Sequence, residues 1–221
     1  KADKKIHLSG LIHLGQQSYF DSLSTALQGQ QAILLAEGVS DNEGLLQHRF
    51  DYRKIADLLG LSAQEQMLID GRLVDAASLD RMEDKLPNKP DVLQADIDLS
   101  EFDERTIEVL NALGRYLLSN DSLADGFRKF NQWTEQNSSP ETNQVVMDDL
   151  VRKRNRAVLR YLPKALQKYD TVVIPWGALH MPGIEVAVKN KGFSLQEQHE
   201  RLSVDFFQLP YGRLLGPEEE N

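Results

Sequence analysis

The clearest indication of the fold comes from Thr171-Val172-Val173-Ile174-Pro175, followed directly by Trp176-Gly177-Ala178-Leu179-His180. Its first half is almost entirely apolar, which is the pattern of a strand buried on both faces of a parallel sheet. Its second half places a glycine three residues before a histidine. A glycine lets the chain turn sharply where a strand gives way to a loop, or lets the backbone approach a ligand closely. The stretch therefore predicts a buried strand whose following loop carries His180.

Two further strands with comparable ends lie in the first forty residues. Lys5 to Leu14 predicts a strand that runs into Gly10-Leu11-Ile12-His13, and Ala32 to Ala36 is an apolar run that leads into Glu37. Residues 17–29, between them, have apolar side chains at helical spacing. A strand, a helix and a strand within this length form a βαβ unit with parallel strands. We therefore expect an α/β fold, in which a central mixed, largely parallel sheet is flanked by helices.

A long amphipathic helix is predicted from Glu141 to Gln167, just before the strand that begins at Thr171. Its apolar stripe consists of Met147, Val151, Val158, Leu162 and Ala165. Arg154 and Asn155 fall inside this stripe, whereas Asp149 and several cationic residues fall on the opposite face, which is expected to be hydrated. The sequence thus predicts an arginine and an asparagine on the side of the helix that faces the core.

An arginine in that position needs a negatively charged partner, because Arg is almost never fully buried alone. The candidates for Arg154 are a substrate carboxylate, an oxyanion, or a protein carboxylate such as Glu37 or Asp96, which its planar fork of donors suits. The alternative is a structural salt bridge inside the core. Asp96 and Asp98 lie where a short strand, residues 92–97, ends. Both are expected to cap or precede the next helix, and Asp96 is the better candidate to face a site.

The middle of the chain predicts a helical insertion. Helical patterns occur there at residues 53–59 and 63–76. Ser62 stands three residues before a glutamate, which is the spacing of a capping box ahead of the second pattern. We expect a single domain over residues 1–221, in which an insertion of about residues 42–86 covers the site as a lid. Residues 194–209 predict two closing strands, and residues 217–221 predict an acidic tail.

The composition excludes several classes of protein. The 221 residues carry a net charge of −9 and include no cysteine. Binding to nucleic acid needs a positive surface, so we expect no nucleic-acid partner. A Cys nucleophile, thiolate-bound zinc and a disulfide framework are excluded. No apolar run approaches the ~20 residues of a membrane span. Because residue 1 is Lys rather than Met, a signal or membrane anchor upstream stays open, and we favour an extracytoplasmic location over a cytoplasmic one. An oligomer also stays open.

Each of the three predicted strands ends in a potential metal ligand, namely His13, Glu37 or His180. Sites in open parallel sheets form beyond the carboxyl ends of the strands, so three neighbouring ends would meet at one crevice. Two histidines and a carboxylate with open positions form a catalytic set for Zn, Mn or Fe. The alternative is that both histidines are half-buried and satisfied within the fold, and that Glu37 caps a helix or joins a salt bridge. Trp176 is expected in the core rather than as a platform for substrate.

Together these features resemble the TraB/GumN/Tiki family, within a wider group that includes erythromycin-esterase-like and ChaN-like domains. The family pattern has two G-x-x-H motifs, an acidic residue after the second strand, an Arg-Asn pair on a late helix, and Pro-Gly soon after the second histidine. All occur here in order, at residues 10–13, 37, 154–155, 177–180 and 182–183. The segment from Asp41 to Asn137 matches nothing closely, and we expect it to set specificity.

The resemblance implies a metal-dependent hydrolase, in the first place a peptidase, because the Tiki branch is described as metal-dependent proteases. It implies that His13 and His180 bind a divalent ion (Mn, Co or Zn) and that Glu37 is a third ligand or the general base. Arg154 and Asn155 would position a peptide or small-molecule substrate, or hold the ligands. One alternative is a binding module that uses the same pocket for a peptide signal or haem without turnover. Another is a degenerate member in which the ligands only hold the fold together.

Overall fold

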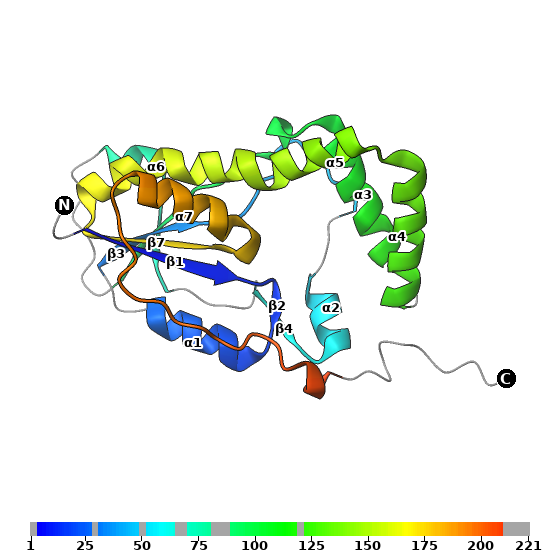
Figure 1. The fold of residues 1–221 in the computed structure, drawn as a ribbon, viewed down its shortest axis with the longest axis horizontal. Helices are drawn as coiled ribbons and strands as arrows, with labels where there is room; N and C mark the ends of the chain where they lie inside the picture. The colour runs from blue at the N-terminus through cyan, green and yellow to red at the C-terminus, as the bar shows by residue number, and fades with distance from the viewer. Residues whose placement is uncertain are drawn as a thin grey trace.

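The computed structural model describes most of the chain, at residues 4–27, 31–48, 52–64, 70–80, 89–118 and 122–209. Its central element is a five-stranded sheet with the order β1-β7-β3-β6-β5 and parallel pairing between neighbours (Figure 1). The strands are β1 (Lys5–Leu11), β3 (Ala32–Ala36), β5 (Arg72–Val74), β6 (Asp91–Gln94) and β7 (Thr171–Gly177). The predicted α/β class is confirmed. Antiparallel pairing occurs outside this sheet, between β2 (Leu14–Gly15) and β4 (Ser62–Ala63).

Helices cover both faces of the sheet. α1 (Gln17–Leu27) lies on one face, and α6 (Arg154–Lys168) and α7 (Met181–Asn190) lie on the other (Figure 1). Each crossover between two parallel strands returns the chain to the same end of the sheet, so that all the strands run in the same direction. The carboxyl ends of β1, β3, β6 and β7 therefore point in one direction, and the loops that leave them gather at one end of the molecule.

The core explains why the strand sequences are continuously apolar. In β3, Ile33 and Leu35 belong to a cluster that includes side chains of α6, whereas Leu34 belongs to a separate cluster with Val173. Neighbouring side chains of a strand point to opposite faces. A strand covered on both sides is therefore apolar at every position. The prediction of doubly buried strands is confirmed for β3 and for β7, whose five central residues are all buried.

The long helix before β7 contains a π-helical turn. α5 (Pro140–Met147) leads into η4 (Asp148–Lys153), which continues as α6. A π turn has hydrogen bonds from i to i+5 and so rotates the helix face that follows it. The predicted spacing therefore fails ahead of Arg154: Asp149, expected on the hydrated face, is buried, and Met147, expected in the apolar stripe, is 45% exposed. Beyond the turn the predicted stripe is confirmed, since the buried residues include Val158, Leu162 and Ala165.

The middle of the chain differs from the predicted helical insertion. The first predicted helix is confirmed as α2 (Tyr52–Leu59), but the prediction of a helix at residues 63–76 is wrong. That range contributes to β4, forms β5, and reaches η2 (Ala76–Leu79). β5 joins the sheet beside β6, and a Cβ at Gly71 would lie only 2.6 Å from Val92 Cγ2. Close approach of two strands here overrides the helical pattern. Residues 49–51, 65–69 and 81–86 of the predicted insertion lie outside the described residues.

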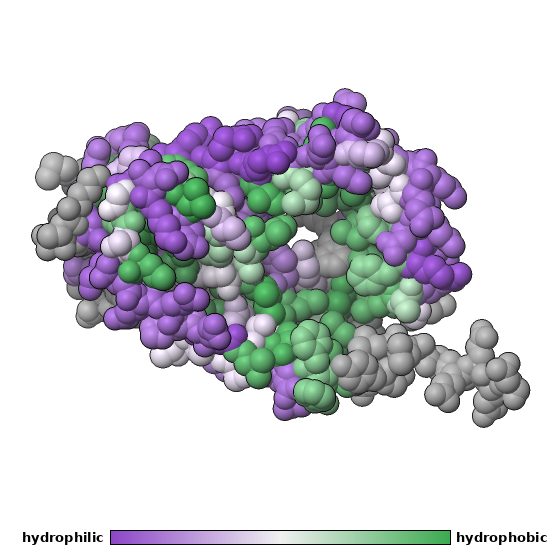
Figure 2. Space-filling view, in the orientation of Figure 1, coloured by the Kyte–Doolittle hydropathy of each residue, from purple (hydrophilic) through white to green (hydrophobic). Residues whose placement is uncertain are grey.

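A helical arm extends beyond the strand ends. It consists of α3 (Glu104–Leu118), which follows η3 (Leu99–Glu101), and of α4 (Leu123–Asn137) packed against it. The arm and α2 lie on the side of the molecule to which the parallel strands point (Figure 1). Figure 2 shows an opening on this side, bordered largely by hydrophobic residues. The loops from the strand ends therefore lie beside a hollowed part of the surface.

The chain after α7 does not form the two predicted closing strands. Residues 194–205 are irregular, and η6 (Phe206–Gln208) follows them. A backbone hydrogen bond from Gln16 N to Ser203 O ties the segment to the start of α1. Apolar side chains in it, such as Phe207, face solvent, so their loose alternation does not indicate a sheet face. The predicted acidic tail lies outside the described residues. None of the described helices has the length and apolar character needed to cross a membrane.

Candidate functional site

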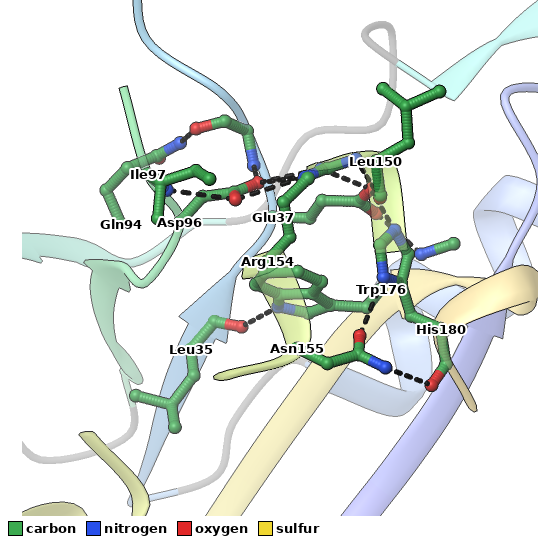
Figure 3. Close-up of polar contacts among 12 residues, drawn as sticks. Leu35, Glu37, Gln94, Asp96, Ile97, Leu150, Arg154, Asn155, Trp176 and His180 are labelled. Atoms are coloured by element: carbon green, nitrogen blue, oxygen red, sulfur yellow. Dashed lines mark hydrogen bonds and ion pairs between the residues drawn. The ribbon is translucent and has the colours of Figure 1, made fainter. Parts of the chain in front are cut away.

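Three of the predicted site residues lie just beyond the ends of neighbouring strands. Glu37 follows β3, Asp96 follows β6, and His180 ends η5 (Ala178–His180), which follows β7. Figure 3 shows their side chains around Arg154, which comes from the first turn of α6. The sheet order places β7 between β1 and β3 and places β3 beside β6. The structure therefore brings together two of the three predicted strand-end residues, Glu37 and His180, and adds Asp96 beside them.

The Glu37 carboxylate is buried and held from two sides. Its side chain is 6% exposed. Oε1 accepts a hydrogen bond from Arg154 Nη2 at 2.7 Å, and Oε2 accepts one from the backbone N–H of Gly177 at 2.5 Å. His180 Nε2 lies 3.5 Å from Oε1. The glycine of the second G-x-x-H motif thus supplies a backbone donor to the acidic residue of the neighbouring strand.

Arg154 is bound to two protein carboxylates at once. Besides Glu37, it contacts Asp96, to which Nη2 donates at 2.7 Å and Nε donates at 3.1 Å. Nη1 is directed at the carbonyl oxygen of Leu150 at 3.5 Å. The Asp96 side chain is fully buried and also accepts the N–H of Gly38 at 2.9 Å. Of the anions predicted as partners of Arg154, the structure therefore shows the two protein carboxylates, Glu37 and Asp96.

The two aspartates after β6 have different roles. Asp96 faces the site through Arg154, as its contacts show. Asp98 caps η3 instead, because its side chain accepts the backbone N–H of Ser100. It also accepts hydrogen bonds from the Ser40 hydroxyl and from the N–H of Asn42. The sequence predicted a capping role for both aspartates, and the structure shows this role for Asp98.

Asn155 fixes the orientation of His180. Its Nδ2 donates to the main-chain oxygen of His180 at 3.3 Å, so its Oδ1 is the atom that faces His180 Nδ1, at 2.7 Å. An amide oxygen only accepts, and Nδ1 must therefore carry a proton. In the neutral ring this leaves Nε2 as an acceptor, and it is Nε2 that faces Glu37.

The surroundings of Glu37 keep it ionised. Burial by itself raises the pKa of this carboxyl group. The interaction with His180, the charge of Arg154 and the hydrogen bond from Gly177 outweigh burial and lower the pKa from 4.5 to about 2. Glu37 is therefore a carboxylate at every pH at which the protein is expected to work. A group this acidic is a good cation ligand and a weak base.

Close packing explains the Pro-Gly pair after His180. Gly183 lies in the first turn of α7, and a Cβ at this position would lie 2.6 Å from Asn155 Nδ2. Only a glycine lets α7 come so near to the amide that orients His180. The glycine of this pair therefore makes room for a side chain of α6.

His13 is not brought together with Glu37 and His180. Its side chain is exposed, and its ring stacks on Tyr52 of α2, with 4.5 Å between the ring centroids. Its backbone oxygen accepts the N–H of Gln64 next to β4. Within the described residues, no three side chains of His, Cys, Asp or Glu form a group that could hold a metal ion. The structure thus shows two of the three predicted ligands side by side.

Trp176 takes part in the site, which its sequence pattern did not indicate. As predicted, it belongs to the core and is fully buried. Its ring also meets the His180 ring edge to face, with centroids 5.1 Å apart, and lies under the Arg154 guanidinium, 5.5 Å from the ring centroid. A tryptophan at the end of a buried strand is usually a core residue, so the sequence gives no signal that Trp176 also contacts His180 and Arg154.

Comparison with known proteins adds no relative: no family model, curated protein or solved structure matches the chain. The resemblance to the TraB/GumN/Tiki family therefore stays a prediction that rests on the quoted motifs. What the structure adds is the geometry of Glu37, Asp96, Arg154, Asn155 and His180.

Proposed function

We propose that this chain is a metal-dependent hydrolase, with peptides as the expected substrates, and that His180 and Glu37 bind the metal ion. One observation carries the proposal. Nε2 of His180 and Oε1 of Glu37 face each other at 3.5 Å, while the proton of the imidazole is held on Nδ1 by Asn155. Two acceptors at this distance repel each other unless a cation, either a second proton or a metal ion, lies between them.

The spacing of the two acceptors suits a shared metal ion. Ligand bonds of about 2.0–2.2 Å at a near-tetrahedral angle place two ligand atoms roughly 3.4 Å apart. The support behind the histidine also suits a ligand, because metal-bound imidazoles almost always donate their other N–H to a neighbouring acceptor. Here that acceptor is Asn155 Oδ1. The residues present therefore fit two positions of a metal site.

His13 is the residue that we propose as the third ligand. β1 and β7 are adjacent, and their register pairs Leu11 with Gly177. His13 follows the first of these residues and His180 follows the second, so both histidines leave neighbouring strands at nearly the same level. To join the site, His13 would have to leave its stacked position on Tyr52.

The chain's own groups divide the remaining work. A metal ion, when bound, would lower the pKa of its water ligand and polarise the carbonyl group of the substrate. Glu37 serves as a ligand rather than as the general base, because an efficient base has a pKa near the working pH. Arg154 holds Glu37 and Asp96 in place, since its donors are already engaged. Asn155 keeps the proton on Nδ1 and so keeps Nε2 available.

The test is metal binding by the purified protein, stripped with chelator and then titrated with Mn²⁺, Co²⁺ or Zn²⁺. We expect about one ion per chain for wild type, and loss of this ion in His180→Ala and in Glu37→Gln. His199→Ala is the matched control, because His199 is exposed and its side chain lies 3.6 Å from an exposed glutamate. A peptide-library assay of the loaded protein then tests hydrolysis. Equal metal responses of all four proteins would refute the metal site.

A purely structural role is favoured by one specific observation. Arg154 already neutralises charge on both Glu37 and Asp96, so the buried carboxylates do not require a metal ion. In that case His180→Ala would lower stability without any change in metal response. The same titration therefore separates a metal site from a degenerate one.

A further inference from the structure

We propose that Trp176 is a positioning residue of this site, whose indole ring orients His180 and Arg154 together and thereby sets the separation between His180 Nε2 and Glu37 Oε1. Where it concerns metal affinity, this inference rests on the proposed function. Where it concerns the orientation of the metal-free side chains, it does not. The experiment below keeps the two apart.

The indole ring of Trp176 is held in place by contacts outside the site. Trp176 is in β7 and is fully buried. The pairing of β3 with β7 extends to Leu34 and Val173. Beyond these residues the indole Nε1–H donates to the carbonyl oxygen of Leu35 at 2.8 Å, which ties β7 to β3 through a side chain. The ring therefore has a defined position where the two strands lead into Glu37 and Gly177.

Two site residues then contact this fixed ring. The imidazole of His180 meets it edge to face, at an interplanar angle of 84°. This is a favoured geometry for aromatic pairs, because the positive edge of one ring meets the negative face of the other. The guanidinium of Arg154 lies over the ring at a distance typical of a cation–π contact. Figure 3 shows the indole between these two residues.

The contacts among the four side chains form a closed ring, in which each side chain touches two of the others. Trp176 contacts His180 and Arg154, Arg154 binds Glu37, and Glu37 faces His180. A change in the position of the ring would therefore move both sides of the His180–Glu37 pair. Asn155 fixes one nitrogen of the imidazole, but a hydrogen bond at Nδ1 alone leaves the ring free to swing about it. The edge-to-face contact with Trp176 removes this freedom.

Simple core filling is the competing explanation, and matched variants separate the two. Trp176→Leu removes the ring, and Trp176→Phe keeps an aromatic ring but lacks the N–H. Leu162→Ala is the control, because Leu162 is fully buried in the same cluster and lies about two turns beyond Arg154 and Asn155 on α6. If Trp176→Leu does not fold, Trp176→Met replaces it, since methionine fills irregular space without a ring.

The first measurement uses the metal-free protein. The ¹⁵N shifts of the His180 ring, assigned by comparison with His180→Asn, report which nitrogen carries a proton, and their line widths report whether the ring is held in one orientation. We expect a protonated Nδ1 and one sharp set of ring signals in wild type and in Leu162→Ala. In Trp176→Leu we expect broadened ring signals, because the imidazole can then swing about its hydrogen bond to Asn155. Wild-type line widths in Trp176→Leu would overturn the proposal.

The second measurement is the Kd for Co²⁺ by calorimetry. Residues that orient a metal ligand typically change affinity by about 10–100-fold when removed. We expect a loss of this size in Trp176→Leu, a smaller loss in Trp176→Phe, which keeps a ring but lacks the bond to Leu35, and no change in Leu162→Ala. Equal losses in Trp176→Leu and Leu162→Ala would also overturn the proposal. If wild type binds no Co²⁺, the proposed function fails, and the ¹⁵N measurement alone decides the role of Trp176.

Discussion

At the scale of single residues, the charges of the site are unusually concentrated. Arg154, with a side chain that is 12% exposed, faces two carboxylates that are 6% and 0% exposed. The sequence indicated that this arginine needs an anion and named Glu37 and Asp96 among the candidates. It could not choose among them, because helical spacing places a side chain on a face of the helix but does not show what the other elements bring to that face.

Removal of the Arg154 charge is therefore expected to lower the free energy of unfolding substantially. Arg154→Met keeps much of the buried stem but leaves two buried carboxylates without a cation. Loss of one partner of a buried ion pair typically lowers stability by about 3–5 kcal/mol. We expect a loss of this size in urea unfolding. Arg160→Met is the control on the same helix, where the arginine is exposed and the change should stay within about 0.5 kcal/mol. Similar stabilities of the two variants would contradict the role given to Arg154.

The acidity of Glu37 predicts a pH dependence of stability with a definite sign. Its pKa is lowered from 4.5 to about 2 in the folded chain. A lowered pKa adds stability that is fully present above the unfolded value of 4.5 and is lost as the pH falls toward 2. The difference corresponds to at most about 3 kcal/mol.

The check is the free energy of unfolding in chelator, measured between pH 6 and pH 3. Wild type should lose more stability over this range than Glu37→Gln, because the glutamine cannot take up the proton. Other carboxylates with lowered pKa values, such as Asp91, titrate in both proteins and cancel in the comparison. Parallel curves for the two proteins would show that Glu37 has an ordinary pKa.

At the scale of secondary-structure elements, the long helix is positioned by its π turn as well as by its apolar stripe. Asp149, in η4, accepts a hydrogen bond from the hydroxyl of Thr106 at 2.6 Å and one from the N–H of Asp103 at 2.8 Å. Lys153 Nζ lies 2.5 Å from the other carboxylate oxygen, as an ion pair rather than a well-directed hydrogen bond. The turn just ahead of Arg154 is thus attached to the start of α3.

The close approach of α7 to α6 gives a prediction at the scale of elements. In an open helix, alanine is more favourable than glycine by about 1 kcal/mol. Gly183→Ala should instead destabilise this protein by about 1–3 kcal/mol, because the new Cβ would lie 2.6 Å from Asn155 Nδ2. A double-mutant cycle with Asn155→Ala checks this. In the Asn155→Ala background the same change should become neutral or stabilising. An equal cost in both backgrounds would place the effect elsewhere.

The elements also show how far the sequence could predict the fold. β3 and β7 were predictable because a strand covered on both faces leaves a continuous apolar run. β5 was not, because it has three residues and one of them, Leu73, is 84% exposed. The π turn was not predictable either, since a single change of hydrogen-bond register leaves no trace in composition. Glu37 and His180 could be predicted from strand ends, whereas the role of Trp176 depends on contacts from three separate segments.

At the scale of the whole molecule, α2 and the sheet are connected through His13. The first G-x-x-H motif leaves the main sheet at β1 and enters the small β2–β4 pair, where α2 packs. The ring of His13 rests there on Tyr52. The proposed third ligand is therefore associated with the middle segment of the chain and not with the other two ligands.

This arrangement predicts that Tyr52 weakens the binding of an ion at the proposed metal site. Aromatic pairs contribute about 0.5–1.5 kcal/mol beyond the area that they bury, and His13 would give up this contact to become a ligand. Tyr52→Leu should therefore tighten the Kd for Co²⁺ by roughly 2–12-fold, whereas Tyr52→Phe, which keeps the ring, should leave it nearly unchanged. Weaker binding in Tyr52→Leu would mean that α2 supports the ligand instead of withholding it.

The distances along the chain between the members of the site have a consequence for its assembly. Glu37 and Arg154 are 117 residues apart, and Asp96 and Arg154 are 58 apart. Contacts between such distant segments close large loops and form slowly and late. A chain with only its first βαβ unit in place would still lack the arginine and His180. Binding of an ion at the proposed metal site would thus report completed folding, and it would stabilise the finished molecule rather than initiate its folding.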